Sequence, residues 1–177
     1  LDKVRRSGYD SLTEEQKWTS FTYRLESSNV DSISKQLASA IRLMPFVLVI
    51  NGRIKEIEVK NLYAKCHFRI IKKDSASKQR IEGDTEWYKI VDEVEITNML
   101  TGKSMSVAVT SLQLFNENGK VNDVVILPPF PECCGSVDTI PSLFLWFPLL
   151  GTESFGVNFI FHSKRWYPVE KRNNIML

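Results

Sequence analysis

The stretch NVDSISKQLASAIRLMPFVLVINGRIKEIEV, residues 29–59, decides the fold that we expect for this chain. Its first half spaces apolar residues at helical intervals, which predicts one amphipathic helix over 31–45. Asn29 or Asp31 is suited to cap its start, and Pro45 is expected to end it because proline lacks an amide hydrogen. The apolar stripe consists of Ile33, Leu37, Ala40, Ile41 and Met44. A helix with one apolar stripe needs a second layer, so we expect a sheet beside it.

The second half of this stretch favours β-structure. Residues 46–50, FVLVI, form a continuous apolar run that is typical of a central strand. Asn51-Gly52 is a strong hairpin signal, because both residues tolerate positive φ angles. We therefore expect a return strand over 54–59 that pairs with the apolar run.

More strands are predicted along the rest of the chain. Apolar residues alternate over 62–71, which indicates a half-buried strand, and the polar segment 74–84 is expected to be a loop. Further strands are expected over 17–25, 86–97, 121–127 and 156–161, and around the inward-facing Met105, Val107 and Val109. Turn residues at 98–102 and 116–119 join them, and residues 143–147 are expected to form one helical turn.

These elements predict an α+β fold with a mostly antiparallel sheet and one long helix packed on a face. Residues 17–177 are expected to form a single domain, and the polar residues 1–16 a linker or the tail of an upstream domain. The chain begins at Leu1 rather than at methionine, so we expect it to be a fragment of a longer protein.

Composition narrows the functional classes. The 23 basic and 21 acidic residues leave a net charge of +2, so we expect no nucleic-acid partner that needs a broadly basic surface. No apolar run reaches the roughly 18 residues of a membrane span, so no membrane contact is expected. Three cysteines, two of them adjacent at Cys133-Cys134, do not indicate a disulfide framework, and a cytoplasmic location is expected.

A basic segment follows the last long strand that we predict. In the strand, Val157, Phe159 and Phe161 are expected to face the core. The loop 164–172 then carries four cations, with Trp166 and Tyr167 inside it; the cations are Lys164, Arg165, Lys171 and Arg172. A strand that presents such a loop can aim charge at a phosphate or carboxylate, although a solvated basic turn has the same sequence pattern.

Three motifs resemble segments of sacsin-like proteins, which belong to the GHKL ATPases together with heat-shock chaperones, gyrases and MutL proteins. The first is PLLGTESFGVNF, 148–159, followed by Arg172-Asn-Asn-Ile175. The second is KWTSFTYRL, 17–25, and the third is LMPFVLVI, 43–50, with IKEIEV, 54–59. Along the chain, from 17–25 through 43–59 to 148–175, the three motifs occur in the order expected for the region that follows the ATP-binding domain.

This resemblance implies that the chain acts next to a nucleotide-binding domain and does not itself bind the nucleotide. The helix and the Asp-x-Gly-x-Gly loop that bind ATP in the superfamily are not found here, so ATP and Mg are expected in an upstream domain of the same chain. The fragment would then be no enzyme and bind no cofactor, and its partners would be that domain and a protein client. In the superfamily the following domain sends a cation to the γ-phosphate. By position this would be Arg172, with Lys171 and Arg165 as runners-up.

A different class of function is also consistent with the basic loop. A stand-alone module could use its aromatic and basic side chains to bind a peptide or a nucleic acid. A third and weaker alternative is a hydrolase whose site no motif of the sequence indicates.

Other motifs carry less weight. Residues 101–104, TGKS, end like a phosphate-binding loop, but Thr97 replaces the required glycine and a strand pattern follows. Cys133-Cys134 with His162 lack the spacing of a metal site, so no metal is expected. We expect His67 to be solvated, His162 to cap the basic loop, and Glu93 and Glu95 to form a solvated acidic edge.

Overall fold

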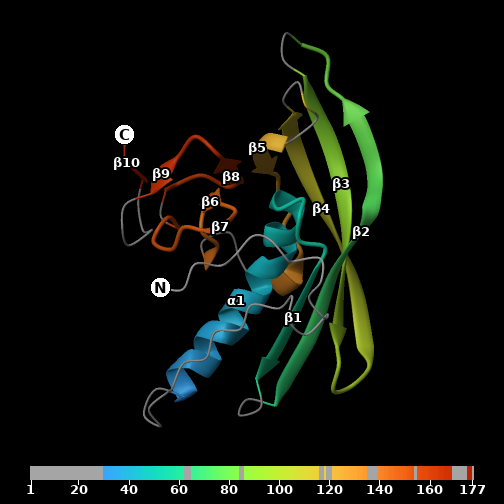
Figure 1. Cartoon of the computed structure of the whole chain (residues 1–177), viewed down its shortest axis with the longest axis vertical. Helices are drawn as coiled ribbons and strands as arrows, with labels where there is room; N and C mark the ends of the chain where they lie inside the picture. Colours follow the sequence, from blue (N-terminus) through green and yellow to red (C-terminus); the bar gives the residue numbers. More distant parts are fainter. Residues whose placement is uncertain are drawn as a thin grey trace, which may run out of the picture.

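The computed structural model places one long helix against a curled, mostly antiparallel sheet, which confirms the α+β class (Figure 1). The structure describes residues 30–61, 65–83, 86–115, 118, 121–134, 139–153, 155–168 and 175–176. The helix α1, Val30–Ile50, lies along the concave side of the sheet. The strand expected over 17–25 lies outside the described residues.

Eight strands form the main sheet in the order β1-β2-β3-β4-β5-β8-β6-β7. Every neighbouring pair is antiparallel except β6 and β8. The strands are β1 Glu56–Asn61, β2 Cys66–Arg80, β3 Trp87–Asn98, β4 Lys103–Phe115, β5 Val121–Ile126, β6 Leu143–Leu145, β7 Phe147–Pro148 and β8 Ile160–Ser163. Two short strands, β9 Tyr167–Pro168 and β10 Ile175–Met176, form a separate pair. The antiparallel meander predicted for the central strands is therefore confirmed.

The helix does not end at Pro45, as the sequence led us to expect. It continues through 46–50, so this apolar run is helical rather than a central strand, and the expected hairpin at Asn51-Gly52 is instead the turn that ends α1. A proline inside a helix costs roughly 3 kcal/mol. The side chains of 46–50 are all buried, and each buried apolar side chain contributes about 1.5–3 kcal/mol, so their packing outweighs that cost.

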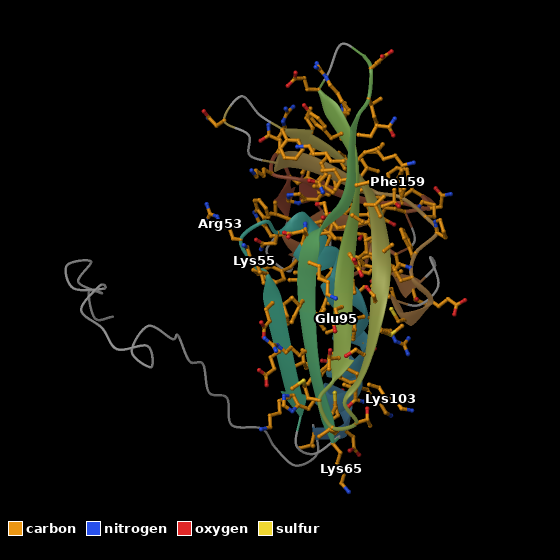
Figure 2. All side chains as sticks on the ribbon, turned by 90° about the vertical axis from the view of Figure 1, so that its right-hand side faces the viewer. Arg53, Lys55, Lys65, Glu95, Lys103 and Phe159 are labelled. Carbon is orange, nitrogen blue, oxygen red and sulfur yellow. The ribbon has the colours of Figure 1, made fainter. Side chains whose placement is uncertain are left out.

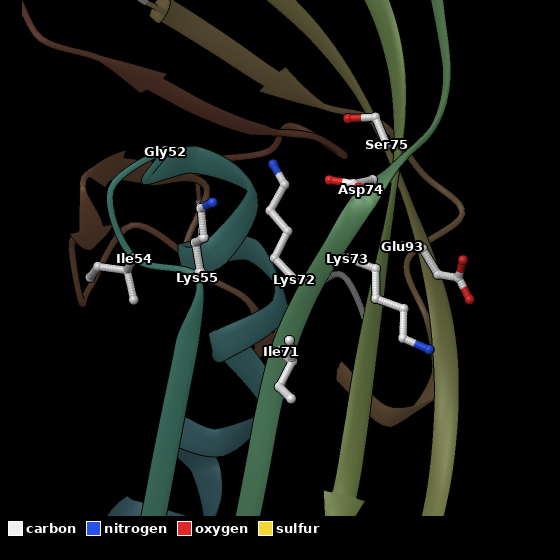
Figure 3. Close-up of a pocket in the computed structure, with 9 residues that line it drawn as sticks. All are labelled: Gly52, Ile54, Lys55, Ile71, Lys72, Lys73, Asp74, Ser75 and Glu93. Atoms are coloured by element: carbon white, nitrogen blue, oxygen red, sulfur yellow. The ribbon is translucent and has the colours of Figure 1, made fainter.

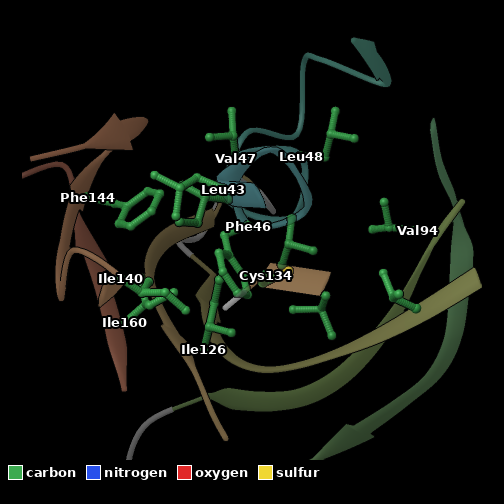
Figure 4. Packing of buried hydrophobic residues seen from close by; sticks show 14 of the residues in the cluster. Leu43, Phe46, Val47, Leu48, Val94, Ile126, Cys134, Ile140, Phe144 and Ile160 are labelled. Carbon is green, nitrogen blue, oxygen red and sulfur yellow. The ribbon is translucent and has the colours of Figure 1, made fainter. Parts of the chain in front are cut away.

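The core lies between this half of α1 and the sheet (Figure 4). Val47 and Leu48 are fully buried, and the Phe46 ring packs edge-on against Phe130 with 5.3 Å between ring centroids. The sheet contributes Ile70, Val94, Val109, Val124, Ile126 and Ile160. Because residues 46–50 are enclosed on all sides, an uninterrupted apolar run suits this helical segment as well as it would suit a strand.

By length and composition alone, α1 could also cross a membrane. The sequence did not indicate this, because it divided the segment into a helix and a strand. In the structure the C-terminal half of α1 is buried against the sheet, which is what a core helix of a globular domain does.

The polar segment 74–84 was expected to be a loop, but its residues 74–80 form a strand, and of its described residues only 81–83 lie outside it. Residues up to Arg80 continue β2 and pair with β3, with register shifts between Lys72 and Ser77. The side chains of 73–80 are all exposed, so no apolar alternation marks this half of the strand. Pairing with a buried neighbour therefore decides its conformation.

Two further expectations are corrected. Residues 143–147 do not form a helical turn, because Leu143–Leu145 is β6 and Phe147 begins β7. Met105 lies at the exposed end of β4, whereas Val107 and Val109 are buried as predicted. The turn between β3 and β4 is confirmed, with Gly102 at a φ of 68° that favours glycine.

Candidate functional site

Strand β8, Ile160–Ser163, holds the basic turn that the sequence pointed to. It lies inside the sheet, antiparallel to β5 and parallel to β6. We predicted this strand over 156–161, but it covers 160–163. The prediction of which side chains face the core was also wrong. Ile160 and His162 are buried, whereas Val157 and Phe161 are half-buried and Phe159 lies outside the strand. Because side chains alternate along a strand, a shift of one residue exchanges the two faces.

The turn after β8 exposes two cations. Lys164 and Arg165 are both exposed, and the Arg165 amide donates a hydrogen bond to Ser163 Oγ at 3.2 Å. Ser163 itself is buried, so the turn starts from a fixed position. The Arg165 guanidinium forms no ion pair within the part of the chain that the structure describes. Lys171 and Arg172, the other two predicted cations, lie outside the described residues.

Aromatic side chains pack against β8 and the turn that follows it. The Trp166 ring meets Phe161 edge-on, with centroids 4.8 Å apart. The Trp146 ring packs against His162 at 4.6 Å, and the Lys164 ammonium lies 5.2 Å from the centroid of Trp146. A cation over an indole face is attracted by the ring. These contacts hold Lys164 beside Trp146, whereas Arg165 is exposed and has no ion pair among the described residues.

His162 is not a cap on the basic loop, as we expected, but a fully buried side chain of β8. Its Nδ1 lies 3.0 Å from the carbonyl oxygen of Phe144, which places the proton on Nδ1. Nε2 is then a buried acceptor that has no partner among the described residues. Burial is the main cause that lowers the pKa of His162, with Lys164 adding to it, while Phe144 and Asp123 oppose the shift. The neutral ring is therefore the stable form.

A second polar cluster lies on the inner face of the sheet and was missed by sequence reasoning. Asp92 of β3 is fully buried. Its Oδ1 is 3.0 Å from Lys72 Nζ and accepts a hydrogen bond from Ser75 Oγ at 2.8 Å. Gln113 Nε2 approaches Oδ2 at 3.5 Å and donates to Ser111 Oγ at 3.0 Å. The sequence does indicate that Asp92 is buried, because it alternates with the apolar residues Ile90 and Val94 along the strand.

Lys72 also lines an open cavity of about 640 Å³ between β2 and the turn that follows α1 (Figure 3). A volume of several hundred Å³ is in the range of ligand-binding clefts. Figure 3 shows Lys55 and Lys72 on one side of β2, whereas Lys73 and Glu93 point to the other. The lining residues are Gly52, Ile54, Lys55, Ile71, Lys72, Lys73, Asp74, Ser75 and Glu93.

The acidic residues that we expected to form a solvated edge lie within the sheet instead. Glu95 pairs with Lys73 at 2.7 Å, and Glu93 accepts a hydrogen bond from the Ser106 hydroxyl. Lys73 is the main cause that lowers the pKa of Glu95. His67 is likewise not simply solvated, because its Nε2 lies 2.6 Å from Glu58 Oε1. Glu93, Glu95 and His67 therefore each have a partner on a neighbouring strand.

The remaining motifs have structural roles. Residues 101–104 form the β3–β4 turn and the start of β4, so no helix follows them to bind a phosphate. Cys133 and Cys134 have their sulfur atoms 3.8 Å apart, and burial raises the pKa of the Cys134 thiol. Within the described ranges, no three His, Cys, Asp or Glu side chains gather as metal ligands.

No known family model, curated protein or solved structure matches this chain. Any assignment of function therefore depends on the geometry of the turn after β8 and of the cavity beside β2, together with the sequence motifs.

Proposed function

We propose that this chain is a transducer-like or middle-like domain of a larger sacsin-like GHKL ATPase and binds no nucleotide itself. Its work is to couple the ATP state of an upstream domain to domain arrangement or to contact with a protein client. The observation that carries this proposal is Arg165, an exposed cation directly after a buried strand. The motif resemblance at 17–25, 43–59 and 148–175 supports the same assignment.

The physical basis is a cation that meets the nucleotide in one arrangement only. Such a cation stabilises the charge that develops on the γ-phosphate, and it makes the closed arrangement depend on ATP. Arg165 provides a fixed starting point, because its amide is bound to the buried Ser163. Arg172 remains the residue that we expect to reach the phosphate, with Lys171 and Arg165 as alternatives. A cytoplasmic location is part of this proposal.

The test is ATP hydrolysis by the full-length protein that contains this chain. We expect Arg172→Ala to lower the rate about tenfold or more, because it removes a cation from the transition state. Lys171→Ala and Arg165→Ala report on the two alternative residues. Lys103→Ala is the control, because Lys103 is exposed at the far end of the sheet (Figure 2). Unchanged rates in all three test variants, or no nucleotide-binding domain upstream, would show that the proposal is wrong.

The alternative of a peptide- or nucleic-acid-binding module requires rings that can stack on a ligand. Trp146 and Trp166 are only half-exposed, and each already packs on a ring of β8. Titration of the chain with single-stranded nucleic acid distinguishes the two functions, since salt-sensitive binding is expected only of the module.

A further inference from the structure

The two halves of β2 differ in their neighbours. The lower half, 66–71, pairs with β1, and the Lys72 amide donates to the Lys55 carbonyl oxygen at 2.9 Å where β1 begins. The upper half continues to Arg80 with β3 on one side only. No strand of the described chain covers its other side. Within the part of the chain that the structure describes, this half is therefore an open edge, and in Figure 1 it curves upward beyond the end of β1.

Among the described residues, the backbone amides on this open side of β2 face no partner strand. The Ile81 amide donates to the Trp87 carbonyl oxygen at 2.8 Å, so it points toward β3. Successive amides point in opposite directions along a strand, so the amide of Arg80 and that of Lys78 point to the open side. Residues 77–80 keep a regular register with β3. Such an edge is a template for another strand.

The cavity lies at the lower end of this edge. Register shifts between Lys72 and Ser77 mark a bulge, which bends the strand away from the turn that follows α1. Lys55 extends into this space without an ion pair to any described residue. Lys72 contacts Asp92 at 3.0 Å, and an ammonium has three donors. Asp74 is the acidic side chain on the same side, and Lys72 is already paired with the buried Asp92, so Lys55 is the ammonium group there that has no carboxylate partner among the described residues.

We propose that the upper edge of β2 binds the extended C-terminal peptide of a partner protein as an added antiparallel strand. The backbone of the peptide pairs with the amides of Lys78 and Arg80, and its terminal carboxylate is bound by Lys55 and Lys72. An antiparallel strand at this edge runs in the same direction as β1, so its C-terminal end arrives at the cavity. The chain must stop there because β1 occupies the next position, and a C-terminus stops without needing a turn. This surface is separate from the turn after β8.

Fluorescence anisotropy with the 177-residue chain tests this proposal. The probe is a fluorescein-labelled heptapeptide of alternating threonine and valine with a free C-terminal carboxylate, and its twin carries a C-terminal amide. We expect the free acid to bind about tenfold more tightly than the amide, because a charge-assisted hydrogen bond is lost in the twin. Lys55→Gln should remove this difference, whereas Lys60→Gln, an exposed lysine on β1, should keep it.

A proline on the edge tests the backbone contact. Lys78→Pro removes one outward amide and should weaken both peptides about tenfold, while Lys78→Ala should bind them normally. Both variants lose the contacts of the Lys78 ammonium with the rings of Tyr88 and Phe115, so their difference isolates the amide. Slower hydrogen exchange at the Arg80 amide on peptide addition gives a second measurement in the unaltered chain.

Several results would overturn the proposal. It is wrong if neither peptide binds saturably, if acid and amide bind equally, or if the proline and alanine variants bind alike and exchange at Arg80 is unchanged. Sedimentation velocity of the chain alone examines a second copy as the occupant. A dimer that Lys78→Pro disperses would assign the edge to self-association instead of a partner peptide.

Discussion

Two buried polar side chains of the sheet, Asp92 and His162, are stabilised in different ways. Both are fully buried, but Asp92 has Lys72 and Ser75 within 3.0 Å, whereas His162 contacts only backbone groups of Phe144 and Trp146 through Nδ1 and, among the described residues, leaves Nε2 unpartnered. A buried charge without a counter-charge is far costlier than one unmade hydrogen bond of a neutral group. The difference shows that the fully buried carboxylate of Asp92 needs a counter-charge, whereas the His162 ring can leave one nitrogen unpartnered because it stays uncharged.

The largest effect is expected from removing the counter-charge of Asp92. Lys72→Met leaves a buried carboxylate without its cation and should lower the free energy of unfolding by about 3 kcal/mol. Urea unfolding at neutral pH measures this change. Much of the loss should return in the double variant Lys72→Met/Asp92→Asn, because the buried group is then neutral. A single variant as stable as the unaltered chain would mean that Ser75 and Gln113 suffice to hold Asp92.

A smaller effect is expected from pH, through His162. Burial lowers the pKa of His162 in the folded chain below its ordinary value of 6.5. As the pH falls below about 6.5, the unfolded chain binds a proton that the folded chain does not, so the free energy of unfolding should decrease. Urea unfolding at pH values about one unit above and one unit below 6.5 measures this difference.

The chain supplies a matched control for that measurement, because it has two histidines. His162→Leu should reduce the loss of stability between the two pH values, whereas His67→Gln should leave it in place. If His67→Gln reduces the loss as much as His162→Leu does, the burial of His162 is not what makes the stability depend on pH, and the comparison with Asp92 fails.

The smallest effect is expected on the outer face of the sheet. Glu56 accepts two hydrogen bonds from Arg69, at 2.6 and 2.9 Å, and this contact lowers the pKa of Glu56. Both side chains are exposed, and water and salt weaken such pairs. Arg69→Ala should therefore leave the urea midpoint unchanged within error. A clear loss would show that burial is not what separates Asp92 from the surface pairs.

The candidate sites were only partly predictable. The exposure of Arg165 followed from a basic turn after a strand, and the inward position of Asp92 is indicated by the alternation of Ile90, Asp92 and Val94. Its partner Lys72 could not be predicted, because the bulge in β2 changes which side chains meet across the strands. No local pattern indicated the open edge at 77–80, which exists because β1 is shorter than β2.

The amino-acid sequence alone determined the α+β class, strand β3 and the turn before β4, because alternation and turn residues act over a few neighbours. The tertiary structure decided that 46–50 is helical, that 74–80 is a strand, and which face of β8 is buried. In each of these cases the local pattern allows more than one conformation. Contacts with residues distant in the chain then decide, because they determine which arrangement buries apolar surface and pairs the backbone.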